Sequence, residues 1–420
     1  MPTKKSLLQR LHSIRSLESA WKNLRKSRDG KSHGLSGETI KVFQSNLSSN
    51  LRLVQQKLRD SAYVFSPLRA VTISKGKGSF DLRPLRIPEV RDRLVLKAIA
   101  NTISPYLYEK YKLKNPASFA YHSKLGAREA IEQIVSLYNS GKRVVLEADI
   151  RKFFDTVDRS YLLERMVYPC LPDDTIDGLI ERGLAQEIGN LGELSVAARE
   201  LFDASEQGIP QGNALSPLLS NVYLSPFDHE MLENKFSLVR YADDFVVMCA
   251  SEEEANKAYK LARSILENQL KVQIYPLDTN NRESKATRIV KPSTEPLEFL
   301  SVRFNGCNIW PSRDKVNALK ERIREVTNPS DQTDVISLLT QCRNVLYGWL
   351  AAFSYTDVDR YFLELDELVD KQLAYAFRKM GLTLRKLAET KEKAVKLSAI
   401  QRRRTGIRTC EEFVSRIRNR

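Results

Sequence analysis

Two adjacent aspartates, Asp243 and Asp244, stand between the apolar runs of residues 237–242 and 245–250. The β-branched and aromatic residues on both sides predict a hairpin with the two acids at its turn. Neighbouring carboxylates repel each other, and a turn packed among apolar strands is a costly place for them unless a cation binds. Mg²⁺ takes oxygen ligands and keeps positions open for phosphates. A metal site is therefore one interpretation, and an ordinary Asp-Asp turn is the other.

A third aspartate, Asp149, follows the apolar run of residues 144–148, which predicts a buried strand. Two-metal phosphoryl transfer needs carboxylates from at least two chain segments, with the ions ~3.5–4 Å apart. Asp149 and Asp243 would supply such a set, with one ion at the attacking oxygen and the other at the leaving group. For the nearby Asp155 and Asp158, capping of the following helix is the favoured interpretation.

A glycine-rich turn at residues 207–213 leads into a predicted helix that continues to about residue 224. Gly212 would allow a close backbone approach, and Gln211 could hydrogen-bond a base or a sugar. A plain junction between a loop and a helix explains the same pattern equally well.

Positive charge is concentrated at the two ends of this 420-residue chain, whose formal net charge is +15. Residues 1–60 carry +9, residues 371–420 carry +11 and the middle carries −5. Basic side chains neutralise phosphates and release counterions, so the ends predict nucleic-acid contact, with solvated helices as the alternative. An acidic centre is consistent with a site built from carboxylates.

Several classes of protein are disfavoured by composition. The five cysteines form no CxxC pair, and the four histidines exclude an HExxH motif, so neither a disulfide framework nor a zinc site is expected. No run approaches 18 apolar residues, and no apolar segment follows the basic start, so we expect no membrane contact and a location in the bacterial cytoplasm.

The elements that must position these residues follow from the hydrophobic spacing. Helices are expected over 6–28, 39–60, 91–112, about 125–140 and 252–270, and between about 150 and 205. Strands are expected within 61–90, with turns at Lys75–Gly78 and Pro84, at 143–149 and near 272–275, 288–291 and 297–304. From about residue 313 the chain is expected to be helical to its end.

In this order the segments resemble a bacterial reverse transcriptase of the group II intron type, over about residues 25–375. The catalytic box is matched by Tyr241-Ala242-Asp243-Asp244, and the first palm acid motif by Asp149 with Phe153-Phe154-Asp155. The template and nucleotide motif is matched by Pro210-Gln211-Gly212 with Leu215 to Asn221, and the fingers motif by Arg83 to Pro88 with Arg91-Asp92-Arg93. Later palm motifs are matched by Ser284-Lys285 and Phe299-Leu300-Ser301, and the start of the thumb by Gly348-Trp349.

The resemblance implies an α+β right-hand polymerase. Its parts would be a basic helical N-terminal extension (1–60), fingers with part of the palm (61–140), a palm with the catalytic motifs (141–312), and a helical thumb with a basic tail (313–420). It also implies an RNA-directed DNA polymerase that uses dNTPs and two Mg²⁺ ions, or Mn²⁺ in their place.

Individual roles carry over onto matching positions. Asp149, Asp243 and Asp244 would be catalytic and, with Ile150, would hold the metals. Phe154 would be a gate against the ribose 2′-OH, or a core aromatic, and Lys285 would contact pyrophosphate or be solvated. The other implied nucleotide contacts are Lys75, Lys77, Arg83, Phe153, Gln211 and Gly212, and the predicted RNA or DNA contacts are Arg91, Arg402, Arg403 and Arg404.

Some positions depart from the family. Arg86 stands where glycine is usual, and residues 118–123 lack the usual Phe-Arg-Pro pattern. No endonuclease-like segment follows the thumb. The absence of such a segment and of a zinc-ligand pattern, with the short length, favours a stand-alone enzyme that copies a structured noncoding RNA into cDNA, as compact bacterial enzymes of antiphage defence do. The alternatives are an intron maturase without an endonuclease, acting as a splicing cofactor, and an RNA-dependent RNA polymerase, which Phe154 disfavours.

Overall fold

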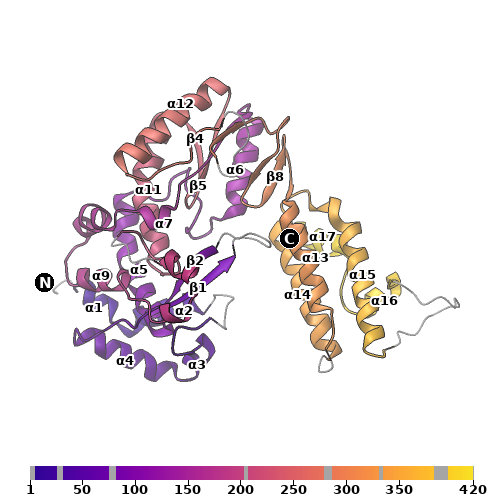
Figure 1. Cartoon of the computed structure of the whole chain (residues 1–420), viewed down its shortest axis with the longest axis horizontal. Coiled ribbons are helices and arrows are strands. Elements are labelled where there is room, and N and C mark those ends of the chain that lie inside the picture. The colour runs from indigo at the N-terminus through magenta and orange to yellow at the C-terminus, as the bar shows by residue number, and fades with distance from the viewer. Residues whose placement is uncertain are drawn as a thin grey trace. The chain divides into compact units, whose positions relative to one another are not determined.

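The computed structural model describes residues 5–25, 32–74, 82–202, 207–278, 286–330, 334–382 and 396–419. The chain divides into two compact units, coloured along the sequence in Figure 1. The first unit holds Met1–Ala130 and Val145–Ile289, and the second holds Ile131–Val144 and Val290–Arg420. The predicted nucleotide contacts Lys75, Lys77 and Lys285 lie outside the described residues.

The first unit begins with four short helices packed around one long, buried helix. Each of the two predicted N-terminal helices is broken once: His12 ends the first helix and Ser13 caps the next, where it accepts from Ser16 N, and Asn46 separates the later pair. The four helices are α1 (Leu7–Leu11), α2 (Ile14–Leu24), α3 (Ile40–Ser45) and α4 (Leu47–Arg59), and the long helix is α5 (Val90–Lys110).

An antiparallel hairpin follows α4, made of β1 (Arg69–Ser74) and β2 (Leu82–Ile87). Arg83 lies on β2 opposite Ile73 and is exposed. The hairpin confirms strands within 61–90, but the predicted turn at Pro84 is wrong, because Pro84 lies within β2 opposite Thr72.

A four-stranded sheet forms the centre of the first unit, in the order β4-β5-β3-β6. The strands are β3 (Val144–Asp149), β4 (Ser237–Tyr241), β5 (Asp244–Cys249) and β6 (Arg288–Val290). Helices α11 (Ser216–Glu233) and α12 (Glu252–Arg263) pack beside β4 and β5 (Figure 1). The predicted hairpin is confirmed, with Ala242 and Asp243 as its turn and Asp244 as the first residue of β5.

Helix α11 runs nine residues beyond its predicted end at Leu224, through Pro226. Buried Phe227 and Met231 continue its core face, so tertiary packing offsets the backbone hydrogen bond that proline cannot donate. Short helices lie between β3 and α11: α7 (Phe153–Thr156), α8 (Arg159–Tyr161), α9 (Asp177–Leu184) and α10 (Val196–Arg199). Asp158 caps α8 as predicted, but Asp155 lies inside α7 and does not cap a helix.

The second unit is mainly helical and has its own core around Leu346, Leu350 and Leu373. The prediction of helices after residue 313 is confirmed within the described residues, whereas strand β9 was not predicted. None of the described helices is long and apolar enough to cross a membrane. The elements are α6 (Ala127–Asn139), β7 (Leu297–Phe299), β8 (Val302–Asn305), β9 (Asn308–Pro311), α13 (Arg313–Val326), α14 (Val335–Phe353), α15 (Phe362–Lys379), α16 (Ala399–Arg404) and α17 (Cys410–Arg418).

Candidate active site

The carboxyl groups of Asp149 and Asp244 meet where β3 ends and the neighbouring β5 begins. The two side chains lie close enough for the Asp149 carboxyl group to act on the pKa of Asp244. Desolvation beside the neighbouring acids raises the pKa of Asp244 to about 7 although the residue is exposed at the surface, and the nearby carboxylates of Asp243, Asp149 and Glu147 add to the rise. The sequence predicted Asp149 together with Asp243, whereas the structure brings Asp149 and Asp244 into contact, with Asp243 beside them. The catalytic role of the three acids stays a prediction.

Asp243 stands in the turn, next to these acids. Burial raises its pKa, while a backbone hydrogen bond and the guanidinium groups of Arg83 and Arg240 act in the opposite direction. Arg83, which was predicted to hold a triphosphate, is thus close enough to Asp243 to act on its charge.

The donor set fits a divalent cation by its chemistry. The described part of the chain contains no ready-made group of three or more His, Cys, Asp or Glu ligands. Asp149 and Asp244 nevertheless supply oxygen ligands. A hard cation bound between them would neutralise their mutual repulsion. Beside them, Arg151 N donates to Gln273 O and Tyr275 N donates to Asp149 O, so the carbonyl of Ile150 points away from residues 273–275.

The glycine-rich loop joins α7 to β2 by backbone hydrogen bonds. Gly208 N donates to Val157 O at 2.7 Å, Ile209 N to Phe154 O at 2.8 Å, and Arg86 N to Gln211 O at 3.0 Å. Gly212 has φ +102°, and a Cβ there would lie 2.6 Å from Arg86 O. The predicted close approach at Gly212 is therefore made to the chain's own β2, and it fixes Gln211 beside this strand.

Arg86, which departs from the family's glycine, is also used within the chain. Its guanidinium lies 5.6 Å from the centre of the Phe202 ring, a cation–π distance. Desolvation lowers its pKa, and the Asp155 carboxylate opposes the decrease. The arginine at position 86 therefore connects β2, through its contact with Phe202, to the segment before the glycine-rich loop.

Phe153 and Phe154 differ sharply in burial. Phe153 is 1% exposed, and its ring packs edge-on against those of Phe154 and Tyr223. The Phe153 ring is enclosed in the core and cannot reach a substrate, so a nucleotide contact at this position would have to come from its backbone and stays a prediction. Phe154 is half-buried, and its carbonyl is held by Ile209 N.

The basic residues predicted to contact RNA or DNA also differ in exposure. Arg402 is 2% exposed and donates to Asp370 at 2.7 Å and to Asp366 at 3.1 Å, so its predicted phosphate contact is wrong. Arg403 and Arg404, on the same helix α16, are exposed. Arg91 is half-buried and donates to Ser66 Oγ at 2.8 Å.

Sequence reasoning missed Tyr121, in the segment that departs from the family. Its side chain is 46% exposed, and its backbone has φ +66°. Burial raises its pKa, and the charge of Asp243 adds to the rise, which indicates that the phenol lies close to that carboxylate. The sequence signal was the departure itself, which did not show where the segment lies.

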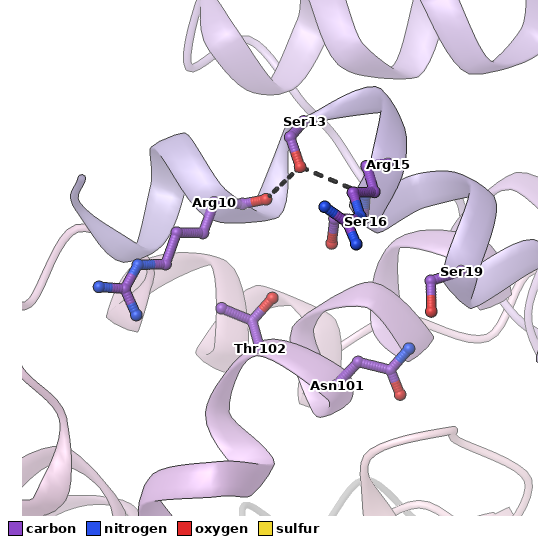
Figure 2. A pocket seen from close by; sticks show the side chains of 7 residues that line it. All are labelled: Arg10, Ser13, Arg15, Ser16, Ser19, Asn101 and Thr102. Atoms are coloured by element: carbon purple, nitrogen blue, oxygen red, sulfur yellow. Dashed lines mark hydrogen bonds between the residues drawn. The ribbon is translucent and has the colours of Figure 1, made fainter.

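A separate polar hollow of about 310 Å³ lies in the first unit between α1, α2 and α5 (Figure 2). Ser13 Oγ donates there to Arg10 O and accepts from Ser16 N. The lining side chains are guanidinium, hydroxyl and amide groups, without an acid: Arg10, Ser13, Arg15, Ser16, Ser19, Asn101 and Thr102.

Known proteins share this sequence pattern. YkfC of Escherichia coli K12 is 27% identical over 286 residues, which cover 59% of this chain and 71% of YkfC. The group II intron-encoded protein LtrA of Lactococcus lactis subsp. cremoris is 28% identical over 221 residues, covering 53% of this chain and 34% of LtrA. The chain thus matches only about a third of the length of LtrA. The predicted resemblance to bacterial group II-type proteins is confirmed.

Two solved structures show weaker likeness. Apo telomerase from Candida tropicalis has a TM-score of 0.40 at 13% identity, covering 82% of this chain and 63% of the telomerase chain. A partial Cas6-RT-Cas1–Cas2 complex has a TM-score of 0.36 at 24% identity, covering 63% of this chain and 43% of the other. At these scores neither likeness bears on function.

The family model that matches is described as "Reverse transcriptase (RNA-dependent DNA polymerase)" and covers residues 73–304. This range is more than half of the chain and contains Asp149, Asp243 and Asp244. The mixed fold of helices and sheets agrees with the α+β right-hand polymerase expected from the sequence. The chain belongs to the reverse transcriptase family, the RNA-dependent DNA polymerases.

Proposed function

We propose that this chain copies a structured noncoding RNA into cDNA in the bacterial cytoplasm, by two-metal nucleotidyl transfer at Asp149, Asp243 and Asp244. The observation that carries the proposal is the contact between Asp149 and Asp244, with Asp243 beside them. Bound Mg²⁺ or Mn²⁺ would neutralise charge at the primer 3′-oxygen and at the α-phosphate of the dNTP. The three carboxylates, with the carbonyl of Ile150, would hold the ions.

The chain's other residues would orient the nucleotide. Arg83 acts on the charge of Asp243 and is exposed, so it is suited to hold the triphosphate. Phe154 is half-buried and would meet the sugar, and Gln211 would contact the nucleotide from the anchored loop. Lys75, Lys77 and Lys285 keep their predicted roles as proposals.

The RNA would be held through its phosphates by exposed basic side chains. Arg403 and Arg404 on α16 are candidates. Arg91 is another, through the guanidinium nitrogens that do not donate to Ser66 Oγ. In the first unit, the acid-free hollow that Arg10 and Arg15 line is suited to a backbone phosphate (Figure 2).

The proposed template is tested by recovering the protein from cells and sequencing the bound RNA together with any attached DNA. We expect one abundant structured RNA and DNA complementary to it. An intron RNA would instead support a maturase, and a diffuse RNA mixture without DNA would contradict a dedicated template. Loss of protection against phage in an Asp243→Ala/Asp244→Ala strain would support the defence role, and unchanged protection would exclude it as a consequence of DNA synthesis.

The raised pKa of Asp244 makes the stability of the metal-free protein depend on pH. Its folded value of about 7 lies above the ordinary 3.8, so between these values the folded state keeps a proton that the unfolded state loses. This contribution is fully present below about pH 4 and is lost as the pH rises to about 7. In EDTA, urea unfolding should show a larger loss of stability from pH 5 to pH 8 in wild type than in Asp244→Asn.

Addition of Mg²⁺ at pH 8 should recover stability in the wild type, because the cation replaces the lost proton as a source of neutralisation. Equal pH slopes for wild type and Asp244→Asn would show that Asp244 does not titrate in this window.

A further inference from the structure

Arg240 lies at 0% exposure on β4, two residues before the turn that contains Asp243. Its Nε and Nη2 donate to the two carboxylate oxygens of Asp228, both at 2.6 Å. Asp228 is on α11 and is 1% exposed. The result is a bidentate ion pair closed to water between the strand of the catalytic hairpin and the helix packed on it.

The remaining donors of Arg240 reach two other segments. Nη1 donates to the carbonyl of Ala242 at 2.9 Å and to Asn221 Oδ1 at 3.2 Å, and Nη2 donates to Ser118 Oγ at 2.9 Å. Along the backbone, Arg240 N donates to Ala117 O and Phe119 N donates to Arg240 O. One side chain therefore ties the turn to α11 and to the segment that carries Tyr121.

The same segment makes further hydrogen bonds. Asn221 Nδ2 donates to Ala120 O at 2.9 Å, and the ring nitrogens of His122 lie 3.1 Å from Ser118 Oγ and 2.9 Å from Tyr108 Oη. Every hydrogen bond of this network is made by buried or half-buried groups, so the arrangement is rigid.

The turn needs such support, because Ala242 has φ +60°. A non-glycine residue in the left-handed region is strained and persists only where the surroundings hold it. The bond from Arg240 Nη1 fixes the carbonyl of Ala242, and with it the peptide plane that leads into Asp243. A buried ion pair is weak evidence of a role in stability, because an apolar pair of similar volume is often as stable.

We propose that Arg240 is a positioning residue, which holds the Ala242–Asp243 peptide so that the Asp243 carboxylate faces the metals shared with Asp149 and Asp244. The proposal rests on the catalytic role proposed for Asp243. Lysine cannot replace Arg240 in this role, since one ammonium group keeps a charge beside Asp228 but cannot form the fork that also reaches Ala242 O.

The test is Arg240→Lys in the full-length chain. Binding of Mn²⁺ to the protein with a 3′-dideoxy-terminated primer–template is measured by EPR, and DNA synthesis is measured separately. We expect about tenfold weaker Mn²⁺ binding, a kcat at least about tenfold lower and an unchanged KM for dNTP. Raising the Mn²⁺ concentration should restore part of the rate. Wild-type Mn²⁺ affinity in folded Arg240→Lys would overturn the proposal.

A matched control is Arg402→Lys, since Arg402 is also buried and paired with two acids but lies in the other unit. It should lower thermal stability without changing Mn²⁺ affinity, and an equal loss of affinity would overturn the proposal. If Arg240→Lys does not fold, Arg240→Met/Asp228→Leu removes both charges together. A folded double variant with weakened Mn²⁺ binding supports positioning, whereas wild-type affinity, or loss of cooperative unfolding in both variants, assigns the network to folding alone.

The catalytic role proposed for Asp243 is tested separately from the positioning role of Arg240. Retained synthesis by Asp243→Ala would remove the role of the acid on which the positioning depends. Loss of synthesis in Asp243→Ala, together with wild-type Mn²⁺ binding and synthesis in Arg240→Lys, would overturn only the inference about Arg240.

Discussion

Replacing Asp243 and Asp244 together by alanine should reduce DNA synthesis by at least about 10³-fold and leave RNA binding intact. The double change leaves Asp149 as the single carboxylate of the three, so the site loses most of the charge that attracts a divalent cation. RNA binding should persist, because the exposed basic residues lie on other elements. Primer extension on an RNA template measures synthesis, and filter binding measures RNA affinity at a fixed salt concentration.

The matched control is Glu252→Ala/Glu253→Ala, which removes two adjacent, exposed acids at the start of α12 and changes the net charge equally. It should keep wild-type synthesis. Synthesis at the wild-type rate in the Asp243/Asp244 variant would place the chemistry elsewhere in the chain. A variant that lacks synthesis but still assists the splicing of an intron would support the splicing-cofactor alternative.

The parts of the site that the sequence predicted depend on local patterns. The apolar runs on both sides of Asp243 predict a hairpin, because each run is as short as a strand and the two are separated only by residues that favour a turn. The strand before Asp149 is equally local. A meeting of Asp149 with the Asp243-Asp244 pair could be expected because phosphoryl transfer needs acids from two segments, although the sheet order decides that Asp244 is the neighbour.

Other properties depend on partners far away in the sequence. Arg402 belongs to a run of three arginines that suggests a surface, yet Asp366 and Asp370 on α15 bury it. Phe153 and Phe154 are neighbours of one residue type, and packing against Tyr223 decides which is enclosed. No local pattern distinguishes the members of either group, because burial is set by tertiary packing.

The network around Arg240 was missed for the same reason. Arginine within a strand beside two acids would usually be assigned to the acids or to solvent, whereas Asp228 and Ser118 lie 12 and 122 residues away along the chain. The close contact of Gly212 with Arg86 is equally remote in sequence. From the sequence, a close backbone approach at Gly212 and a plain junction between a loop and a helix explained the pattern equally well.

Replacing Phe154 by alanine should relax the choice between deoxyribonucleotides and ribonucleotides by on the order of 10²-fold, through faster use of rNTPs. A bulky ring beside the sugar excludes the 2′-OH by steric clash, and truncation to a methyl group removes the clash. The backbone should keep its place, since Ile209 N still donates to the carbonyl of residue 154. Single-nucleotide incorporation with dCTP and rCTP, compared as kcat/KM, measures the change.

Phe153→Leu separates the gate from general damage to the core. Phe153 is enclosed, so this change should cost about 1 kcal/mol of stability while selectivity stays unchanged. If folded Phe154→Ala rejects rCTP as strongly as wild type, Phe154 is a core residue and the gate lies elsewhere. If wild type itself prefers rCTP, no gate operates and the chain acts as an RNA-dependent RNA polymerase, because a ring that excludes the 2′-OH is incompatible with that preference.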